Sequence, residues 1–509
     1  MSRIGQPSRR QALALGGSLT ATAGAAFLAG CASGTPARHG GHGSAGESAR
    51  ASVSPSGVLR FESRPDLRPS AARITTNTGA AEPGVILLDS HGGAGQQGPM
   101  ILDRAGNLVW FKGLSSDATS ALRAFNLRVQ TYRGEPLLTW WQGAVVDGHG
   151  QGHYVLANSR YQQVKTVRAH GGLQGDLHEF LLTASGTALF ICYQTASADL
   201  RALGGMAGEQ YFDGVVQEVD LATDKLVFQW RSDQHVPLSD SYVSVPPRAA
   251  NPWDPFHLNS ISVAPDGNLI VSARNAWTVY KINRTSGAVI WQLGGKHSDF
   301  TMSRRTRFAW QHHVTAHPDG IFTIFDNEAG DYRVGKQSRG LVLRVDEAAG
   351  TVSFVRQFNP PVHILSGALG SVQELPGGHV FMGWGERPYF TEYGSDGSIV
   401  FDGHLTSKHS VDYRAFKSPW TGRPAGRPAV AVRKAGNSVS AYVSWNGDTE
   451  VRRWRLLSGR TPTALAVVAS AARSGFETKI RVSQPAGYLA IAGLDEHDRE
   501  LGRSAVSRL

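Results

Sequence analysis

Residues 253–274 read WDPFHLNSISVAPDGNLIVSAR, a pattern that predicts one strand–turn–strand unit. The tetrapeptide PDGN has the chemistry of a turn, and the apolar run after it predicts a returning strand that delivers Arg274. Side chains alternate faces along a strand, so we expect His257 and Asn259 to point the same way. An imidazole, an amide and a guanidinium brought together form a site suited to a tetrahedral oxyanion. The alternative is a structural hydrogen-bond cluster at a strand end.

Units of this kind recur along the chain between about residues 85 and 405. We count six units of roughly 45 to 60 residues, each with enough short strands for a four-stranded sheet. This repeat predicts an all-β fold, a six-bladed β-propeller, with a pair of β-sandwiches as the alternative. Propeller edges are protected by ring closure, so we expect a strand near residues 58–61 to complete the last blade.

Four domains follow from the changes in composition along the chain. Residues 1–30 are expected to form a signal peptide and residues 31–57, which are rich in Gly, Ser, Ala and Pro, a flexible tether. Residues 58–425 form the expected propeller. Residues 426–509 contain further short alternating strands, which favour a small β-sandwich of the fibronectin type III kind.

The N-terminus reads as a targeting signal. Arg9 and Arg10 stand in a twin-arginine pattern before an apolar, small-residue run, and residues 28–31, LAGC, match a lipobox that ends at Cys31. This predicts export by the twin-arginine route and lipid anchoring at Cys31 to the outer face of the cell membrane. The apolar run is short and interrupted by Gly and Thr, which makes a plain membrane anchor the weaker alternative. The second cysteine, Cys192, then has no disulfide partner and is expected in the core.

The formal net charge of +10 raises the possibility of nucleic-acid binding. The basic residues are spread along the chain without a run of five, which argues against a nucleic-acid partner. For an exported protein, anionic lipid headgroups and small anionic substrates are the better match for this charge.

Three histidines, His178, His257 and His312, each come just before an expected inner strand. Inner strands of a propeller line one central channel, so we expect these imidazoles to converge near its axis. Three histidines can bind zinc. No HExxH pattern is present and Arg274 would repel a cation, so we expect neither a metal nor another cofactor.

The motifs DLHEF, DPFHLNSI with SAR, TSGAVIWQLGG, FAWQHH with FDN, and SWNGDTEV occur here in that order. Together they resemble the PAPS-independent arylsulfotransferases, in particular the arylsulfotransferase-like branch of actinobacteria and fungi. The resemblance covers most of residues 58–460. It implies a six-bladed propeller that moves a sulfuryl group from a phenolic sulfate ester to a phenolic acceptor through a sulfohistidine.

The resemblance also implies roles for particular residues. The nucleophile falls on His312, and the other functional positions fall on His178, His257, Asn259 and Arg274. This branch has an acidic residue after the nucleophile where this chain has His313, which leaves open which imidazole reacts. The chemistry of sulfuryl transfer suits Arg274, His257 and Asn259 as donors to the sulfuryl oxygens and His178 as general acid or base.

Two other functions remain open on the residues alone. A quinone-dependent dehydrogenase propeller would need tryptophan-docking repeats and a calcium-binding acidic cluster, which the sequence lacks. A non-catalytic ligand-binding propeller lipoprotein is the stronger rival, because His313 departs from the family pattern. The identity of donor and acceptor is not readable from the sequence.

We predict that Cys31→Ala releases the protein from the membrane after export, because the lipobox then lacks the thiol that carries the lipid. Fractionation of cells into membrane and soluble fractions measures this. Undiminished membrane retention of the variant would refute the lipid anchor.

Overall fold

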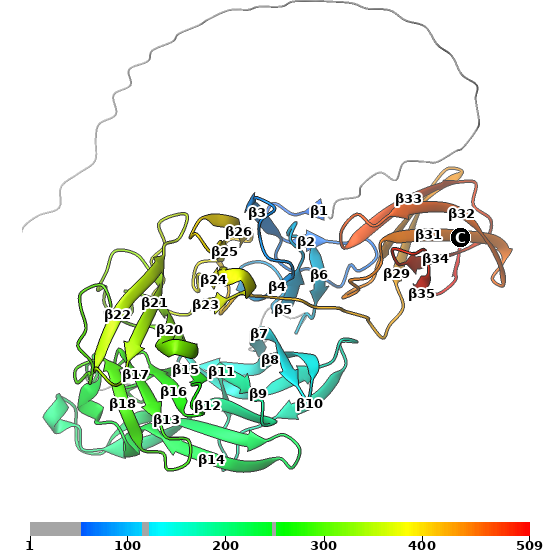
Figure 1. Cartoon of the computed structure of the whole chain (residues 1–509). Coiled ribbons are helices and arrows are strands. Elements are labelled where there is room, and N and C mark those ends of the chain that lie inside the picture. Colours follow the sequence, from blue (N-terminus) through cyan, green and yellow to red (C-terminus); the bar gives the residue numbers. More distant parts are fainter. Residues whose placement is uncertain (1–51, 115–121, 247–250) are drawn as a thin grey trace, which may run out of the picture. The chain divides into compact units, whose positions relative to one another are not determined.

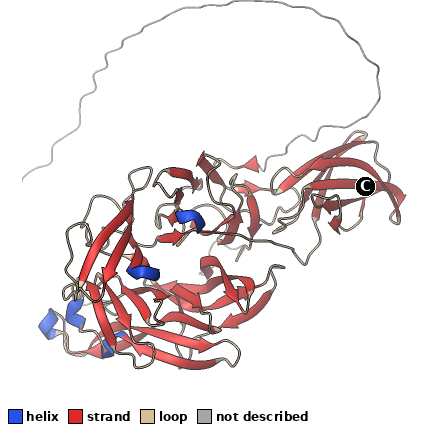
Figure 2. Ribbon diagram, in the orientation of Figure 1, coloured by secondary structure: helices blue, strands red, loops and turns tan. Residues whose placement is uncertain are grey.

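The computed structural model describes residues 52–114, 122–246 and 251–509. The twin-arginine pattern and Cys31 lie outside the described residues. Strands dominate the described part, and its helices are short 3-10 turns (Figures 1 and 2). None of the helices among the described residues has the length and apolarity to cross a bilayer. The fold is all-β, as the sequence predicts. The 3-10 helices are η1 (Arg201–Leu203), η2 (Ser232–Gln234), η3 (Leu238–Asp240), η4 (Pro318–Gly320) and η5 (Pro376–Gly378).

Two antiparallel sheets consist of four strands that follow one another in the chain. One contains β15 (Leu258–Val263), β16 (Leu269–Ala273), β17 (Thr278–Ile282) and β18 (Val289–Gly294). The other contains β19 (His312–Ala316), β20 (Ile321–Asp326), β21 (Arg339–Asp346) and β22 (Thr351–Phe358). Each sheet therefore corresponds to one expected repeat unit.

The strand–turn–strand unit predicted from residues 253–274 is present. Its turn is closed by two backbone hydrogen bonds, from Ala264 N–H to the carbonyl of Asn268 and from Gly267 N–H to the carbonyl of Ala264, both 2.8 Å long. Gly267 has a φ of 86°, a conformation that favours glycine. Arg274 follows β16 directly, as expected.

Two further sheets combine strands from distant parts of the chain. One contains β23 (Ser371–Glu374), β24 (Val380–Gly383), β25 (Tyr389–Tyr393), β26 (Ile399–Leu405) and β3 (Ala72–Asn77). The other contains β4 (Val85–Gly92), β5 (Gly98–Leu102), β6 (Leu108–Phe111), β27 (Ser410–Val411) and β28 (Phe416–Ser418). N-terminal and C-terminal segments of this region therefore share both sheets.

An eight-stranded sheet contains the remaining strands of this region. They are β7 (Leu122–Tyr132), β8 (Glu135–Val146), β9 (His149–Ala157), β10 (Gln163–Val167), β11 (Gly175–Leu182), β12 (Thr187–Ala198), β13 (Glu209–Asp220) and β14 (Lys225–Arg231). Its two halves of four strands meet at a single residue pair, Gly152 with Gly175. A Cβ at Gly175 would lie 2.8 Å from the Tyr154 ring and 3.2 Å from the carbonyl oxygen of Gly152, so this close approach favours glycine.

The expected closing strand at residues 58–61 is wrong. In the structure β2 (Leu59–Arg60) pairs only with β1 (Ser52–Val53) among the described strands. Beyond it, the backbone N–H groups of Glu62 and Ser63 donate to the Glu477 carboxylate, so they cannot join a ladder. The edge of β26 is instead covered by β3, and β4 pairs with β28.

The C-terminal residues form two more antiparallel sheets. Their strands are β29 (Ala429–Ala435), β30 (Ser438–Ser444) and β33 (Glu477–Ser483), and β31 (Arg453–Thr461), β32 (Ala464–Ala472), β34 (Tyr488–Leu494), β35 (Glu500–Arg503) and β36 (Ser507–Arg508). Trp454, Leu456 and Ile491 lie in a buried cluster confined to this region. Alternation in the sequence indicates four of these eight strands, β30, β31, β33 and β34, and misses β29, β32, β35 and β36. The residues of β29 and β32 are alanine-rich and largely exposed, so they carry little alternation.

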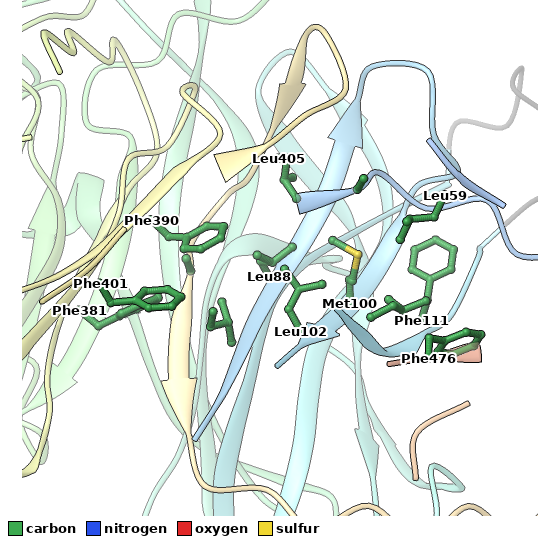
Figure 3. Close-up of a cluster of buried hydrophobic side chains, with 14 of the residues drawn as sticks. Leu59, Leu88, Met100, Leu102, Phe111, Phe381, Phe390, Phe401, Leu405 and Phe476 are labelled. Carbon is green, nitrogen blue, oxygen red and sulfur yellow. The ribbon is translucent and has the colours of Figure 1, made fainter. Parts of the chain in front are cut away.

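A buried hydrophobic cluster includes residues of the two sheets that contain β4 and β24, and also Phe476 of the C-terminal region (Figure 3). Met100, Phe111 and Phe61 belong to this cluster, and Phe61 is in ring contact with Phe476 at 4.4 Å between centroids. Burial of such side chains stabilises a fold by about 1.5 to 3 kcal/mol each. This apolar contact therefore contributes to holding the C-terminal sheets against β4–β6.

One buried cation connects three segments of the fold. Arg414, between β27 and β28, has no exposed surface, and its guanidinium donates to Glu179 Oε2 at 3.0 Å and to the carbonyl of Asn259 at 2.8 Å. The neighbouring Tyr413 hydroxyl donates to the carbonyl of His178 at 2.9 Å. The strands that carry His178 and Asn259 are therefore held to the chain segment near β28.

We predict that Arg414→Met lowers the free energy of unfolding by about 3 to 5 kcal/mol, because it removes one of the two cations that pair with buried Glu179 and leaves the Asn259 carbonyl without its donor. Arg433→Met is the control, since Arg433 and Glu62 form an exposed pair whose loss costs about 1 kcal/mol or less. Urea unfolding of both variants measures the difference. Equal losses in the two variants would contradict the role assigned to Arg414.

Candidate functional site

The centre of the candidate site is a contact between two imidazoles. Nε2 of His178, on β11, lies 3.2 Å from Nε2 of His257. The His178 side chain is buried, and its Nδ1 lies 2.6 Å from Oδ1 of Asp176. The same carboxylate oxygen accepts the backbone N–H of His178 at 2.9 Å, so Asp176 fixes both the main chain and the ring.

His257 stands just before β15, in a turn and not on the strand. Its φ is 50°, and Asp254 holds it through Oδ1 to its backbone N–H at 2.9 Å and through Oδ2 to its Nδ1 at 2.5 Å. Strict alternation from His257 to Asn259 is therefore wrong, because His257 is not extended and the register shifts between Leu258 and Ser260. The hydrogen bonds to Asp254, three residues earlier, hold His257 outside the strand.

Asn259 supports the neighbouring strand. It is fully buried, and its amide nitrogen donates to the carbonyl of Gln311 at 2.7 Å. Gln311 directly precedes His312. Asn259 therefore acts on the site indirectly, by holding the backbone that precedes His312.

Arg274 lies largely buried beside a tryptophan. Its guanidinium stacks 4.8 Å from the ring of Trp310 and donates to Asn275 Oδ1 at 2.6 Å and to the carbonyl of Gly367 at 3.0 Å. Its Nε is buried without a hydrogen-bond partner among the described residues. Neutral partners leave the positive charge uncancelled, so Arg274 can still attract an anion.

His312 begins β19 and is 1% exposed. Its Nδ1 lies 2.8 Å from Oδ1 of Asn327, and the Asn327 amide nitrogen donates to the carbonyls of Ser366 and Leu369. These donations orient Asn327 so that its oxygen faces the imidazole, which places the ring hydrogen of His312 on Nδ1. Nε2 therefore carries the lone pair, which accepts the backbone N–H of Leu369 at 3.2 Å.

The surroundings of His312 keep it neutral. Burial, the positive charge of Arg274 and the neighbouring His178 and His257 hold the pKa of His312 well below its ordinary value, although the bond to Asn327 opposes this. A neutral imidazole with its lone pair on Nε2 is a competent nucleophile once the Leu369 N–H is displaced.

His313 has different surroundings. Its Nδ1 accepts the backbone N–H of Val372 at 3.2 Å, and its φ is 46°. Burial and the charge of Arg414 lower its pKa well below the ordinary value, while Glu179 opposes the shift. The two adjacent histidines thus belong to different clusters, and it is His312 that lies near Arg274, His178 and His257.

The sequence analysis missed the carboxylates and one further histidine of this cluster. Asp176 and Asp254 stand two and three residues before His178 and His257, so their spacing is a signal that local reading could have used. His149 lies 105 residues from Asp254 and no local pattern points to it, yet its Nε2 is 3.1 Å from Asp254 Oδ2.

His149, Asp254 and His257 also have the donor types of a metal site, with ligand atoms within 4.8 Å of one another. Asp254 Oδ2 is within hydrogen-bonding distance of both imidazoles. Burial lowers the pKa of His257 to about 4, Asp254 opposes this, and His178 and Arg274 add to it. The nearby guanidinium of Arg274 disfavours a bound cation at this place. Hydrogen bonds from His149 and His257 to Asp254 explain the arrangement of the three residues without a metal ion.

We predict that added zinc or calcium leaves the midpoint of thermal unfolding unchanged, because hydrogen bonds already satisfy Asp254. The protein is first dialysed against a chelator, and metal content is then measured. A saturable rise in the midpoint that disappears in Asp254→Asn would overturn the metal-free interpretation.

Solved structures resemble this chain only distantly. A protein of unknown function from Bacteroides caccae is 12% identical over 66% of this chain and 99% of that chain, with a TM-score of 0.41. A virginiamycin B lyase from Staphylococcus aureus is 9% identical over 74% of this chain and 96% of that one, with a TM-score of 0.34. At these values neither similarity indicates an activity. No curated protein matches the chain.

A protein-family model gives a specific match. The model described as arylsulfotransferase (ASST) matches residues 128–406, which is more than half of the chain. The matched segment contains His178, His257, Arg274 and His312, the residues whose surroundings are described above. The chain belongs to the arylsulfotransferase family.

Proposed function

We propose that this protein is a PAPS-independent aryl sulfotransferase that moves a sulfuryl group from a phenolic sulfate ester to a phenolic acceptor through a sulfohistidine at His312. One observation carries the proposal: a buried, neutral imidazole presents Nε2 beside Arg274 and the His178–His257 pair. Family membership supports the reaction class. The natural donor and acceptor remain to be identified by substrate screening.

The proposed roles follow from the charge that develops during transfer. Sulfuryl transfer, like phosphoryl transfer, spreads negative charge over peripheral oxygens, so Arg274 would stabilise it. Removing one such donor typically costs about 3 to 4 kcal/mol in the transition state. His178, acting with His257, would give a proton to the departing phenolate and take one from the incoming phenol.

Substrate binding would have to displace main-chain contacts made by one segment. The carbonyl of Gly367 accepts from Arg274, and the N–H of Leu369 donates to His312 Nε2. The sulfate oxygens would replace the first contact and the sulfur atom would approach Nε2 in place of the second. Movement of residues 366–369 would therefore accompany binding.

The same two contacts support the second candidate function, a non-catalytic ligand-binding propeller lipoprotein. In such a protein the Leu369 N–H would keep the lone pair of His312 occupied permanently. Transfer from an aryl sulfate to a phenol, measured with purified protein, separates the two candidates because a binding protein would form no product.

We propose that the four-stranded units of residues 58–425 are the blades of a six-bladed propeller. The two halves of the eight-stranded sheet and the four smaller sheets together supply the required units. Residues 426–509, with their own buried cluster, would form the separate fibronectin type III-like sandwich.

We further propose that the protein is exported by the twin-arginine route and anchored through lipid on Cys31. Support comes from the twin-arginine pattern and the lipobox. The tether of residues 31–57 would keep the catalytic region close to the membrane, where it would meet small phenolic compounds.

We predict that His312→Ala abolishes transfer while the protein stays folded, because the variant lacks the proposed nucleophile and the Nε2 atoms of His178 and His257 face each other. Arg274→Ala should slow formation of the intermediate by about 10²- to 10³-fold. Protein mixed with donor and no acceptor should carry one sulfuryl group on the peptide containing His312, detected by mass spectrometry under alkaline conditions.

His317→Ala is the matched control, since His317 pairs with Glu374 at 3.2 Å, outside the cluster, and should keep full transfer. An adduct on His313 would move the nucleophile by one residue. Transfer without any adduct would overturn the covalent mechanism.

A further inference from the structure

If both rings of the His178–His257 pair are neutral, no hydrogen is left for the contact between their Nε2 atoms. Each ring directs Nδ1 at a carboxylate, His178 at Asp176 and His257 at Asp254. A carboxylate can only accept, so both Nδ1 atoms must carry hydrogen when the two acids are ionised. Two neutral rings would then bring two Nε2 lone pairs to within 3.2 Å of each other.

Both acids are ionised in this environment. Burial opposes ionisation of Asp176, but His178 and His149 more than offset it, and the pKa of its carboxyl is lowered. Burial likewise opposes ionisation of Asp254, whose pKa is nevertheless held well below the ordinary value by His257 and His149. Neither carboxyl therefore supplies the missing hydrogen.

We propose that His178 and His257 hold one shared proton between their Nε2 atoms, and that Asp176, Asp254 and His149 are positioning residues that keep it there. One added proton turns the repulsive contact into an N–H···N hydrogen bond. We assign the proton mainly to His178, because Asp176 Oδ1 faces this ring alone, whereas Asp254 Oδ2 is shared between His257 and His149. His149 contributes by donating to the same Asp254 oxygen that faces His257.

The two carboxylates bonded to the pair favour the added proton. Asp176 and Asp254 each place a negative charge on one side of it, while the charge of Arg274 opposes it. His149 sits beside Asp254, and although burial disfavours its charged form, Asp254 and Asp176 raise its pKa. The other titratable groups that face the pair are His312 on β19, Tyr193 on β12 and Tyr413 near β28.

The role of the pair in catalysis rests on the proposed transfer. When the S–O bond of the donor breaks and an S–N bond forms at His312 Nε2, the proton on His178 passes to the departing phenolate oxygen. Both rings of the pair are then neutral. When the acceptor oxygen attacks sulfur and the S–N bond breaks, the phenol proton returns to His178, and no other co-reactant is required.

The direct test is nuclear magnetic resonance of the resting protein without substrate. Long-range hydrogen–nitrogen correlations of isotopically labelled histidine report which ring nitrogens carry hydrogen. At neutral pH we expect one ring protonated at both nitrogens, absent in His178→Gln, and one ring protonated only at Nδ1, absent in His257→Gln. Two neutral rings in the His178–His257 pair, or hydrogen on Nε2 alone in either ring of this pair, would overturn the proposal.

Catalysis supplies the second test through the pH dependence of kcat. Asp254→Asn removes a negative charge next to the pair, so the proton leaves more easily and the alkaline limb should move down by about 1 to 3 pH units. Glu374→Gln is the matched control. Glu374 lies 3.2 Å from His317 Nδ1 and does not contact the His178–His257 pair, so the pH profile of this variant should match that of the wild type.

The outcomes separate this proposal from the proposed function. If no aryl sulfate reacts but the spectra show the doubly protonated ring, the shared proton stands and the transferase assignment fails. If transfer proceeds while both rings are neutral, the shared-proton proposal is refuted and the transferase function stands. The same conclusion follows if Asp254→Asn and Asp176→Asn leave the alkaline limb of the pH profile unchanged.

Discussion

The arrangement of the candidate site depends on the buried ion pair between Arg414 and Glu179. Glu179 follows His178 directly, and the same guanidinium reaches the carbonyl of Asn259, two residues after His257. Separating these segments would leave a charge buried without its partner, which is costly in a protein interior. Arg128 also pairs with Glu179, so the carboxylate is held from two sides and the pKa of Glu179 falls to about 2. The relative positions of His178 and His257 follow from this constraint.

Several residues around the site have left-handed backbone conformations. His257, Trp310, His313 and Leu369 have φ values of 50°, 58°, 46° and 67°. Non-glycine residues in this region cost on the order of 1 to 3 kcal/mol each, and they persist only where surrounding contacts hold them. Here the conformations aim adjacent side chains in different directions. They separate His312 from His313 and bring the Leu369 N–H onto His312.

Much of the fold and part of the site could be predicted from local patterns. The PDGN turn, the returning strand and the position of Arg274 after it follow from alternation and turn chemistry, which act over a few residues. The expectation for residues 58–61 failed because β2 pairs with β1 and the Leu59 N–H donates to the carbonyl of Pro69. The alternation of His257 with Asn259 failed because Asp254 holds His257 out of the strand. In both places, groups outside the expected β-ladder take the backbone hydrogen bonds.

The sequence by itself determined the all-β class, the turn chemistry, the residue types of the site and the family motifs, since these depend on neighbours in the chain. Only the tertiary structure decided which groups share a proton or a carboxylate. His178 and His257 are 79 residues apart, His149 and Asp254 are 105 apart, and Leu369 reaches His312 across 57. Such contacts depend on how separate sheets pack and how their loops bend. Hydrogen-bond geometry at 3 Å is sensitive to that packing, and no local pattern encodes it.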